Sequence, residues 1–371
     1  MPSSVRSTSC SFHRGSVAEA MAFRRLFEWA ADVPHKSERL AFLREELVGR
    51  QSPAIAAIGT LGRVTAAANM RRGGLFGIVY LLLQFATLWD FHWLAELERW
   101  RKAHGRHVRS WFDAIGQLEA LCALARMAAD EPTWSFPRML SDDEPAVIRA
   151  DSMGHPLLPT QRVCNSVELG PPGRVLLVTG SNMSGKSTLL RAIGTNVVLA
   201  QAGAKVCAQQ FDVPNIELAT SMRVHDSLAD GVSFYMAELK RLKQIVDQAA
   251  NAAAQQHRRT CFLLDEILQG TNSRERHIAV TRVIAHLIES GAIGAVSTHD
   301  LELANATELD GKIDCVHFRE SFTQEVDSSG KKTSRMTFDY LMREGVATTT
   351  NALKLLEMVG LDSPHETDRS E

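Results

Sequence analysis

The sequence predicts a chain in two parts, an all-helical N-terminal region followed by an α/β region with a parallel sheet. Two observations indicate this division. From about residue 17 to residue 129, apolar side chains recur at helical spacing and no strand-like alternation interrupts them. From residue 174 onward, short apolar runs alternate with helical segments, as expected of strands that helices cover on both faces. We interpret the proline-rich, acidic stretch 131–145 as a linker and place the two regions at 1–135 and 136–371.

Two segments of the N-terminal region show the amphipathic helix pattern most clearly. Residues 38–47 and 111–128 both carry apolar side chains at positions i, i+3 and i+4. In the second segment this pattern defines one apolar face, made of Ile115, Leu118, Leu121, Cys122 and Ala125.

The apolar stretch Leu75–Trp89 raises the question of a membrane segment. It is shorter than the roughly 20 residues that a membrane-spanning helix needs, and it contains Gln84. It continues into a run in which Trp89, Trp93, Leu97 and Trp100 recur at helical spacing. We therefore expect a buried core helix and no stable membrane insertion.

Charge is distributed unevenly along the chain, although the net charge is only -2. Residues 1–110 contain 16 Lys/Arg and 9 Asp/Glu, so that the remainder of the 41 and 43 carries 25 and 34. A basic N-terminal part fits an anionic partner such as DNA, and it equally fits a solvated helical surface. The six cysteines form no Cys-x-x-Cys pair, which argues against zinc and disulfide frameworks and indicates a reducing, cytoplasmic location.

Three apolar runs of the second region each end in polar residues. The run 174–179 leads into a glycine-rich loop and then a helix, Cys261–Leu264 ends in Asp265-Glu266, and Ala292–Ser297 ends in Thr298-His299-Asp300. The carboxyl ends of parallel strands meet at one edge of a sheet, where ligands bind. Further on, the segments 315–322 and 334–340 flank a polar turn and predict a hairpin.

The glycine-rich loop fits the phosphate-binding pattern G-x-x-x-x-G-K-[ST] in full, from Gly180 to Ser187. Glycines let backbone amides turn inward around phosphate oxygens, and the next helix adds its positive N-terminal end. We expect Lys186 to reach the β- and γ-phosphates and the Ser187 hydroxyl to ligate Mg²⁺. The nucleotide-binding residues expected from this loop are Gly180, Ser181, Asn182, Met183, Ser184, Gly185, Lys186, Ser187 and Thr188.

The carboxylates Asp265 and Glu266 supply the second part of an ATP-hydrolysing site. An apolar strand that delivers an aspartate serves the metal, and the following glutamate polarises the attacking water. His299, at the end of the next strand, is placed to hydrogen-bond the γ-phosphate or the water. We predict Glu266, Lys186 and His299 as catalytic residues, Ser187 and Asp265 as metal ligands, and ATP and Mg²⁺ as cofactors.

These segments together resemble the C-terminal ATPase module of the MutS family of DNA mismatch-repair ATPases. The matching stretches are TGSNMSGKSTLLR, AQAGAKVCAQ, DSLADGVSFYMAEL, LLDEILQGTNSRER and STHD, in the family's order. The resemblance implies an α/β P-loop NTPase of the ABC type, with an N-terminal helical core or lever region and C-terminal dimerisation helices. It covers residues 150–361 strongly and residues 75–137 more weakly.

The resemblance also implies roles for single residues. Asn182 matches the family's asparagine near the nucleotide, and His299 matches its switch histidine. Ser233 matches the signature serine, which in a homodimer reaches the γ-phosphate of the partner's ATP; from the residues alone it indicates only a helix cap. The family's mismatch detectors carry a Phe-x-Glu wedge in a large N-terminal domain. The match here, Phe318-Arg319-Glu320, falls after the ATPase motifs, and we interpret it as chance in a divergent branch that lacks the mismatch-binding domain.

We therefore expect a homodimeric, cytoplasmic ATPase that couples Mg-ATP hydrolysis to DNA binding in mismatch repair or related repair or recombination, with repair proteins as further partners. The alternative is a nucleotide-gated dimerising switch that acts on a protein or membrane partner without binding DNA.

Overall fold

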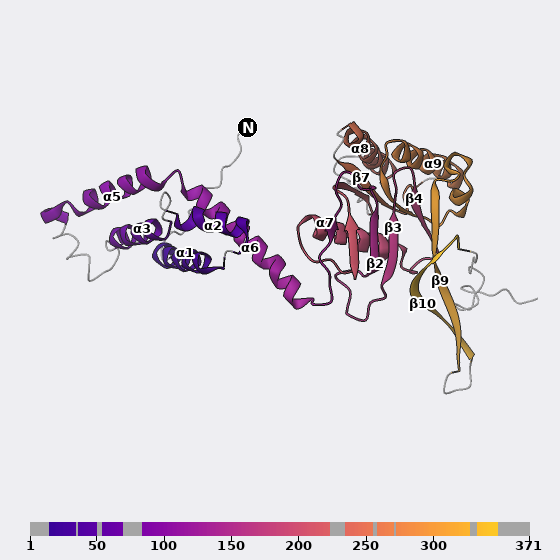
Figure 1. Cartoon of the computed structure of the whole chain (residues 1–371), viewed down its shortest axis with the longest axis horizontal. Helices are drawn as coiled ribbons and strands as arrows, with labels where there is room; N and C mark the ends of the chain where they lie inside the picture. Colours follow the sequence, from indigo (N-terminus) through magenta and orange to yellow (C-terminus); the bar gives the residue numbers. More distant parts are fainter. Residues whose placement is uncertain are drawn as a thin grey trace, which may run out of the picture. The chain divides into compact units, whose positions relative to one another are not determined.

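The computed structural model describes residues 15–34, 36–49, 54–69, 84–222, 234–254, 258–270, 272–326 and 332–347. The chain divides into two compact units, Met1–Arg126 and Met127–Glu371. The division falls inside helix α6 (Val108–Asp130), earlier than the boundary after residue 135 expected from composition. Figure 1 shows the helices of the first unit and the mixed α/β elements of the second.

The first unit also contains the helices α1 (Gly15–Asp32), α2 (Glu38–Val48), α3 (Ala54–Asn69) and α5 (Trp89–His104). The apolar faces of α1, α2 and α3 form one core with α6, and Trp100 of α5 packs against it. The largest buried side chains of this core include Phe27, Leu43, Leu47, Trp111 and Leu118. On α6, the predicted face is correct at Ile115 and Leu118, which are buried, whereas Leu121 is 40% exposed. Cys122 is partly buried and packs against the same core, so the predicted face is confirmed at Ile115, Leu118 and Cys122 but not at Leu121 and Ala125, which are exposed.

Helix α5 corrects the expectation of a buried core helix. It has no buried residue, and Phe91 and Leu94 are 67% and 56% exposed. The helix packs on one side only, where the Trp100 Nε1 donates to the Ala57 oxygen of α3 at 2.7 Å. Residues 75–83 of the same stretch lie outside the described residues. Among the helices that the structure describes, none combines the length and apolar character needed to cross a membrane.

The second unit is built on a six-stranded sheet with the order β10-β9-β4-β8-β7-β6. Its strands are β4 (Val175–Thr179), β6 (Ile216–Ser221), β7 (Arg259–Asp265), β8 (Ile293–Ser297), β9 (Ile313–Val326) and β10 (Lys332–Glu344). All neighbouring pairs are parallel except β9 with β10, which form the predicted antiparallel hairpin. The three apolar runs of the sequence are thus the three central strands β4, β8 and β7.

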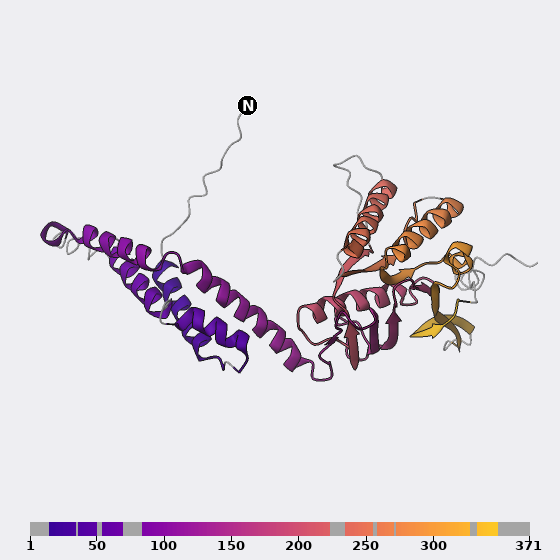
Figure 2. The same cartoon turned by 45° about the horizontal axis from the view of Figure 1, so that its top comes forward.

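Helices cover both faces of this sheet, as Figure 1 and Figure 2 show. Leu176 and Val178 of β4 lie in the core cluster with α7 (Lys186–Gln201). Val175 and Leu177 point the other way, into the cluster with α8 (Phe234–Ala254) and α9 (Ser273–Glu289). Burial on both faces explains why these strands read as continuous apolar runs rather than as alternating ones.

A smaller four-stranded sheet, which the sequence patterns did not predict, completes the second unit. Its order is β1-β5-β2-β3, made of β1 (Arg138–Met139), β5 (Gln210–Val213), β2 (Ile148–Met153) and β3 (Asn165–Leu169). Strand β1 comes from the stretch interpreted as a linker, and Trp134 just before it is only 7% exposed. Trp134 and Leu140 of this stretch are buried in the second unit, whereas Phe136 and Met139 are 67% and 48% exposed, so the stretch expected to be a linker is in part packed.

Candidate ATPase site

The phosphate loop joins β4 to α7 and depends on two glycines. Gly180 has φ 134° and Gly185 has φ 114°, conformations that side chains with a Cβ rarely adopt. A Cβ on Gly180 would lie 2.8 Å from the backbone oxygen of Phe318 in β9. The loop can therefore pass close to β9 only with glycine at this position, and α7 begins immediately after Gly185.

Lys186 is buried in the loop, with 3% of its surface exposed. Its Nζ donates to the backbone oxygens of Gly180 at 3.1 Å and Ser181 at 2.9 Å. The same Nζ lies 3.3 Å from the Glu266 Oε1. Burial lowers the pKa of Lys186, and the nearby carboxylates of Glu266 and Asp265 oppose that shift. The ammonium is thus fixed at the start of α7 by oxygen atoms of the loop and of the Glu266 carboxylate that follows β7.

Ser187 and Asp265 bring two oxygen ligands together. The Ser187 hydroxyl donates to the Asp265 Oδ1 at 2.9 Å, and Ser297 of β8 donates to the same oxygen. Hydroxyl and carboxylate oxygens are hard donors of the kind that Mg²⁺ binds, usually together with phosphate oxygens and water. The two side chains predicted as metal ligands therefore fit a magnesium ion chemically and are in direct contact.

Glu266 follows β7 in a left-handed conformation, with φ 49°. Its backbone N–H donates to Ser297, to the backbone oxygen at 3.1 Å and to the hydroxyl at 3.2 Å. Its Oε1 lies 2.6 Å from the His299 Nε2, and its Oε2 accepts from the Gln269 Nε2 at 2.6 Å. Burial alone would raise the pKa of Glu266, but the charges of His299 and Lys186 and hydrogen bonds from Lys186 and Gln269 leave it lowered.

The strand order explains this convergence. Strand β8 lies between β4, which precedes the phosphate loop, and β7, which ends in Asp265. Because all three are parallel, their carboxyl ends share one edge of the sheet. His299, two residues after β8, thereby reaches both Glu266 and the Lys186 Nζ, the latter at 3.3 Å.

The other predicted loop residues differ in their surroundings. The Ser181 hydroxyl donates to the Glu320 Oε2 of β9 at 2.8 Å. Asn182 and Met183 are exposed, Met183 by 82%, and Thr188 borders the cleft described next. The Ser184 hydroxyl is buried and has no hydrogen-bond partner among the described residues. Ser233 lies outside the described residues.

A cleft of about 630 Å³ adjoins the loop at Met183, Gly185 and Thr188. Its remaining walls come from the segment before β3, from α7 and from the hairpin. They include His155, Leu158, Arg162, Val163, Leu189, Phe318 and Tyr340. The cleft offers an apolar space with a guanidinium and an aromatic ring directly beside the phosphate loop.

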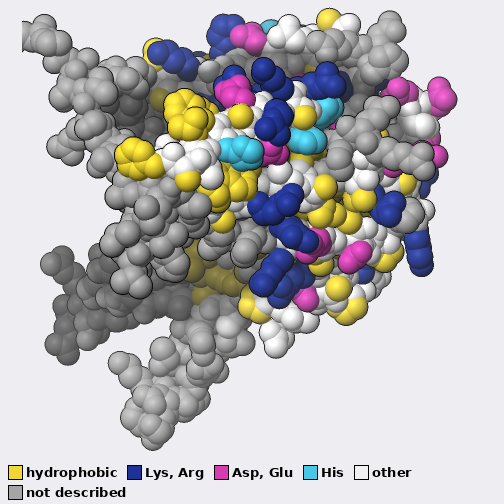
Figure 3. Space-filling model, turned by 90° about the vertical axis from the view of Figure 1, so that its left-hand side faces the viewer, with side chains coloured by type: hydrophobic (Ala, Val, Ile, Leu, Met, Phe, Trp, Pro, Cys, Tyr) yellow, Lys and Arg dark blue, Asp and Glu magenta, His cyan; other side chains and the backbone are white. Residues whose placement is uncertain are grey.

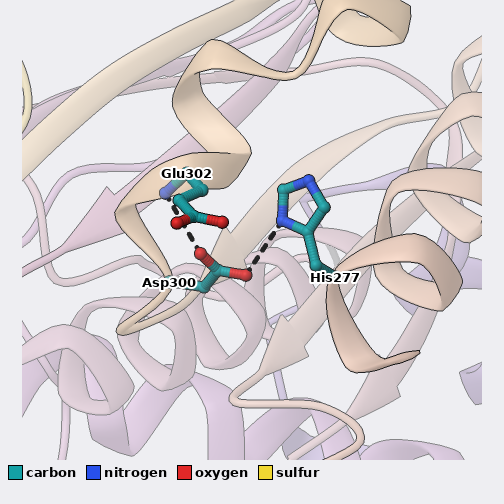
Figure 4. Close-up of side chains that lie close together, drawn as sticks. All are labelled: His277, Asp300 and Glu302. Atoms are coloured by element: carbon teal, nitrogen blue, oxygen red, sulfur yellow. Dashed lines mark hydrogen bonds and ion pairs between the residues drawn. The ribbon is translucent and has the colours of Figure 1, made fainter. Parts of the chain in front are cut away.

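A group of three polar side chains braces the loop that carries His299. Asp300 accepts from the Glu302 N–H at 3.0 Å through Oδ1, and its Oδ2 lies 3.0 Å from the Nδ1 of His277 on α9 (Figure 4). The Asp300 N–H donates to the Thr298 hydroxyl at 3.0 Å. The contact between Asp300 and His277 ties the His299 loop to α9, and the other two hydrogen bonds lie within the loop.

Sequence reasoning missed Gln269, which contacts Glu266, and three further residues in and around the site. Ser297 and Glu320 contact Asp265 and Ser181, respectively. Glu238 of α8 is 4% exposed, and its Oε1 accepts from the Leu268 N–H at 2.8 Å. A signal for Glu238 was present, because it falls on the helical repeat of the buried residues Leu242, Ile245 and Ala249.

The parallel sheet, the phosphate loop and the strand-end carboxylates define a P-loop ATPase domain of the ABC type. A family model described as MutS domain V matches residues 176–366, just over half of the chain. The chain therefore belongs to the MutS family and carries its ATPase domain.

Individual relatives agree with this assignment. The chain is 27% identical over 277 residues to the DNA mismatch repair protein MutS of Natronomonas pharaonis, covering 72% of this chain and 30% of the relative. It is 32% identical over 213 residues to MutS of Granulibacter bethesdensis, covering 55% of this chain and 22% of the relative. It is 29% identical over 269 residues to the DNA mismatch repair protein MSH3 of Chaetomium globosum, covering 68% and 23%. The chain thus spans less than a third of the length of these relatives.

Proposed function

We propose that this chain binds Mg-ATP at Gly180–Thr188 and hydrolyses it by in-line attack of water on the γ-phosphate. The observation that carries the proposal is the convergence at one sheet edge of Lys186 and Ser187 from the loop, Asp265 and Glu266 from the end of β7, and His299 from the end of β8. Phosphoryl transfer needs charge neutralisation and an oriented nucleophile more than covalent chemistry. These five side chains supply both requirements.

Each residue has a role that follows from its contacts. Lys186 lies at the loop, where its ammonium can exchange the Glu266 carboxylate for phosphate oxygens. Glu266, whose pKa is lowered by its neighbours, accepts hydrogen bonds as a carboxylate and can orient and polarise a water. His299 contacts both and can stabilise charge on the transferring group. Ser187 and Asp265 would hold Mg²⁺, which when bound neutralises phosphate charge.

The cleft beside the loop is the proposed site for the adenine base. A planar base can stack on the Arg162 guanidinium or on the Tyr340 ring, and Leu158 and Val163 supply apolar contact. The proposed nucleotide would thus lie with its phosphates on the loop and its base in the cleft.

A homodimer and a DNA partner belong to the proposal as well. The relatives are named DNA mismatch repair proteins, and the residues of the N-terminal part carry an excess of Lys/Arg. Figure 3 shows that on one face Lys and Arg side chains stand beside Asp, Glu and hydrophobic ones. We propose that the dimer completes each nucleotide site through Ser233 and that nucleotide state changes the grip on DNA. A cytoplasmic location and repair proteins as further partners complete the proposal.

The test is ATP hydrolysis by the purified chain with and without duplex, branched and single-stranded DNA. Glu266→Ala serves as the control that separates the site from contaminating activity. Turnover that requires Mg²⁺, changes with DNA and disappears in the variant supports the whole proposal. If no DNA changes the rate of turnover, the chain is still an ATPase, but hydrolysis is coupled to a protein or membrane partner, as in the alternative of a nucleotide-gated switch. No Mg-dependent turnover overturns the proposal.

A further inference from the structure

Glu238 is a buried acidic side chain that none of the proposed catalytic roles uses. It lies in the second turn of α8, and its Oε1 accepts from the Leu268 backbone N–H at 2.8 Å. Its Oε2 is buried and has no hydrogen-bond partner among the described residues. Burial of a carboxyl group is unfavourable, and an apolar residue would continue the buried face of Leu242 and Ile245 better. The presence of an acidic residue at this buried position must therefore be explained by the contact that its carboxyl group makes.

That contact is with a turn of unusual backbone geometry. Glu266 has φ 49° and Leu268 has φ 60°, so two non-glycine residues on either side of Ile267 adopt left-handed conformations. Such residues persist where the surrounding structure holds them. The Glu266 N–H is held by Ser297 of β8, and the Leu268 N–H is held by Glu238. The turn that aims the Glu266 carboxylate is therefore fixed at both ends, from two different elements.

We propose that Glu238 is a positioning residue that holds the Glu266–Leu268 turn in the geometry hydrolysis requires. This inference rests on the proposed ATPase function and extends it to α8. In the sequence, α8 follows directly on the segment that carries Ser233. A displacement of α8 would reach the turn that carries the water-polarising carboxylate through the Glu238–Leu268 hydrogen bond and through the packing of Ile267 and Leu268 against α8.

The experiment compares Glu238→Gln with Glu238→Met in the full chain. Gln keeps an oxygen that can accept from the Leu268 N–H, whereas Met has similar length and no such acceptor. Ile245→Val, on the same buried face of α8, is the matched control for a loss of packing. The measurements are kcat and KM for ATP, thermal unfolding, and hydrogen exchange of the peptide that contains Leu268.

We expect Glu238→Met to lower kcat roughly 10- to 100-fold, as misplacement of a catalytic group by about 1 Å does. KM should change little, and the Leu268 amide should exchange faster. Glu238→Gln should restore most of kcat and of the protection, and Ile245→Val should lower Tm without lowering kcat. In a Glu266→Gln background, Glu238→Met should add no further loss, because both changes act through one carboxylate.

Equal kcat in wild type and Glu238→Met would overturn the inference while leaving the ATPase intact. The inference would also be overturned if kcat fell equally in Glu238→Gln and Glu238→Met, or if Ile245→Val lowered kcat as much as Glu238→Met does. If the wild type itself shows no Mg-dependent turnover, the proposed function fails first, and the inference fails with it.

Discussion

At the scale of single residues, the chemistry of the proposed site depends most on Glu266. Its carboxylate contacts His299, Lys186 and Gln269, and all three favour the ionised form. An ionised carboxylate can accept a proton from water, whereas an amide at the same place can only hydrogen-bond it. A substitution of Glu266 should therefore impair hydrolysis without impairing nucleotide binding.

We expect Glu266→Gln to lower kcat by about 10²–10⁴, the usual contribution of a general base. Binding of ATP should be retained, since Lys186 and the loop are unchanged. Single-turnover hydrolysis and equilibrium binding of a labelled nucleotide measure the two effects. Glu289→Gln, an exposed acid at the end of α9, is the control. A Glu266→Gln variant that hydrolyses ATP at the wild-type rate would remove the residue from the mechanism.

Glu238 gives a prediction about stability and pH. Burial raises the pKa of its carboxyl group. A carboxyl with a raised pKa in the folded state stabilises the fold most below its ordinary pKa of about 4.3, and this contribution is lost as pH rises through the folded-state value. Glu238→Gln removes that pH-dependent contribution.

The free energy of unfolding of Glu238→Gln, relative to wild type, should therefore increase from about pH 4 to neutral pH. Any constant cost of the buried amide does not alter this slope. Urea unfolding of both proteins at several pH values measures it. A difference that stays flat or falls with pH would show that the acid is not held in the neutral form.

Some of these residues could be recognised from the sequence and others could not. Lys186, Ser187, Asp265 and Glu266 belong to contiguous motifs whose chemistry is readable locally. Glu320 meets Ser181 across a separation of 139 positions, and Glu238 meets Leu268 across 30. Contacts of this kind depend on how elements pack, and the spacing of residue types along the chain does not encode them.

At the scale of elements, the same distinction separates the two sheets. The central strands of the large sheet are continuous apolar runs because both their faces are covered. Strand β2 alternates buried and exposed side chains and includes charged residues, and β1 and β5 have two and four residues. Strands that are very short or half-exposed have weak sequence patterns, so the smaller sheet was not predicted. The prediction that α5 is a buried helix was wrong for a different reason. The apolar residues of α5 are spread over more of its surface than α3 covers.

Two glycines with open space around them allow a paired prediction about how a glycine-to-alanine change affects stability. Gly116 lies exposed in the interior of α6, and a Cβ there would meet nothing within 4 Å. Gly173 also has open space around it but has φ +95° in the turn before β4.

Gly116→Ala should stabilise its unit by about 1 kcal/mol, the difference in helix propensity. Gly173→Ala should destabilise, since alanine is strained at positive φ. Thermal unfolding followed by circular dichroism compares the two variants with wild type. A destabilised Gly116→Ala protein would contradict the assignment of a regular, exposed helix there.

At the scale of the whole molecule, the chain joins a helical unit to an ATPase unit of the MutS family. The uneven charge is the physical reason for proposing DNA as a partner, and the salt dependence of binding tests it directly. Arg101 and Arg106 are exposed in and just after α5. Each phosphate that such a residue neutralises releases counterions when DNA binds.

Reversing both charges, with Arg101→Glu and Arg106→Glu, should weaken DNA binding. It should also reduce the slope of log K against log salt by about 1 for each phosphate that is no longer neutralised. Arg149→Glu with Arg282→Glu makes the same change of charge on the second unit and serves as the control. If the Arg101→Glu, Arg106→Glu variant binds DNA with unchanged affinity and an unchanged salt slope, these two residues do not contact DNA. That result would favour the alternative of a nucleotide-gated switch that does not bind DNA.

The placement of the tryptophans has a spectroscopic consequence. Of the six, Trp29, Trp89, Trp93, Trp100 and Trp111 belong to the helical unit, where Trp111 is buried and Trp100 is hydrogen-bonded to Ala57. Trp134 alone belongs to the second unit, and the phosphate loop, β7 and β8 contain none. Intrinsic fluorescence is therefore almost entirely a reporter on the helices. The Arg162 guanidinium, which lines the proposed base cleft, lies 5.7 Å from the centroid of the Trp134 ring, so a change in emission on adding nucleotide would register an effect carried out of the ATPase unit only if it persists in a Trp134→Phe variant.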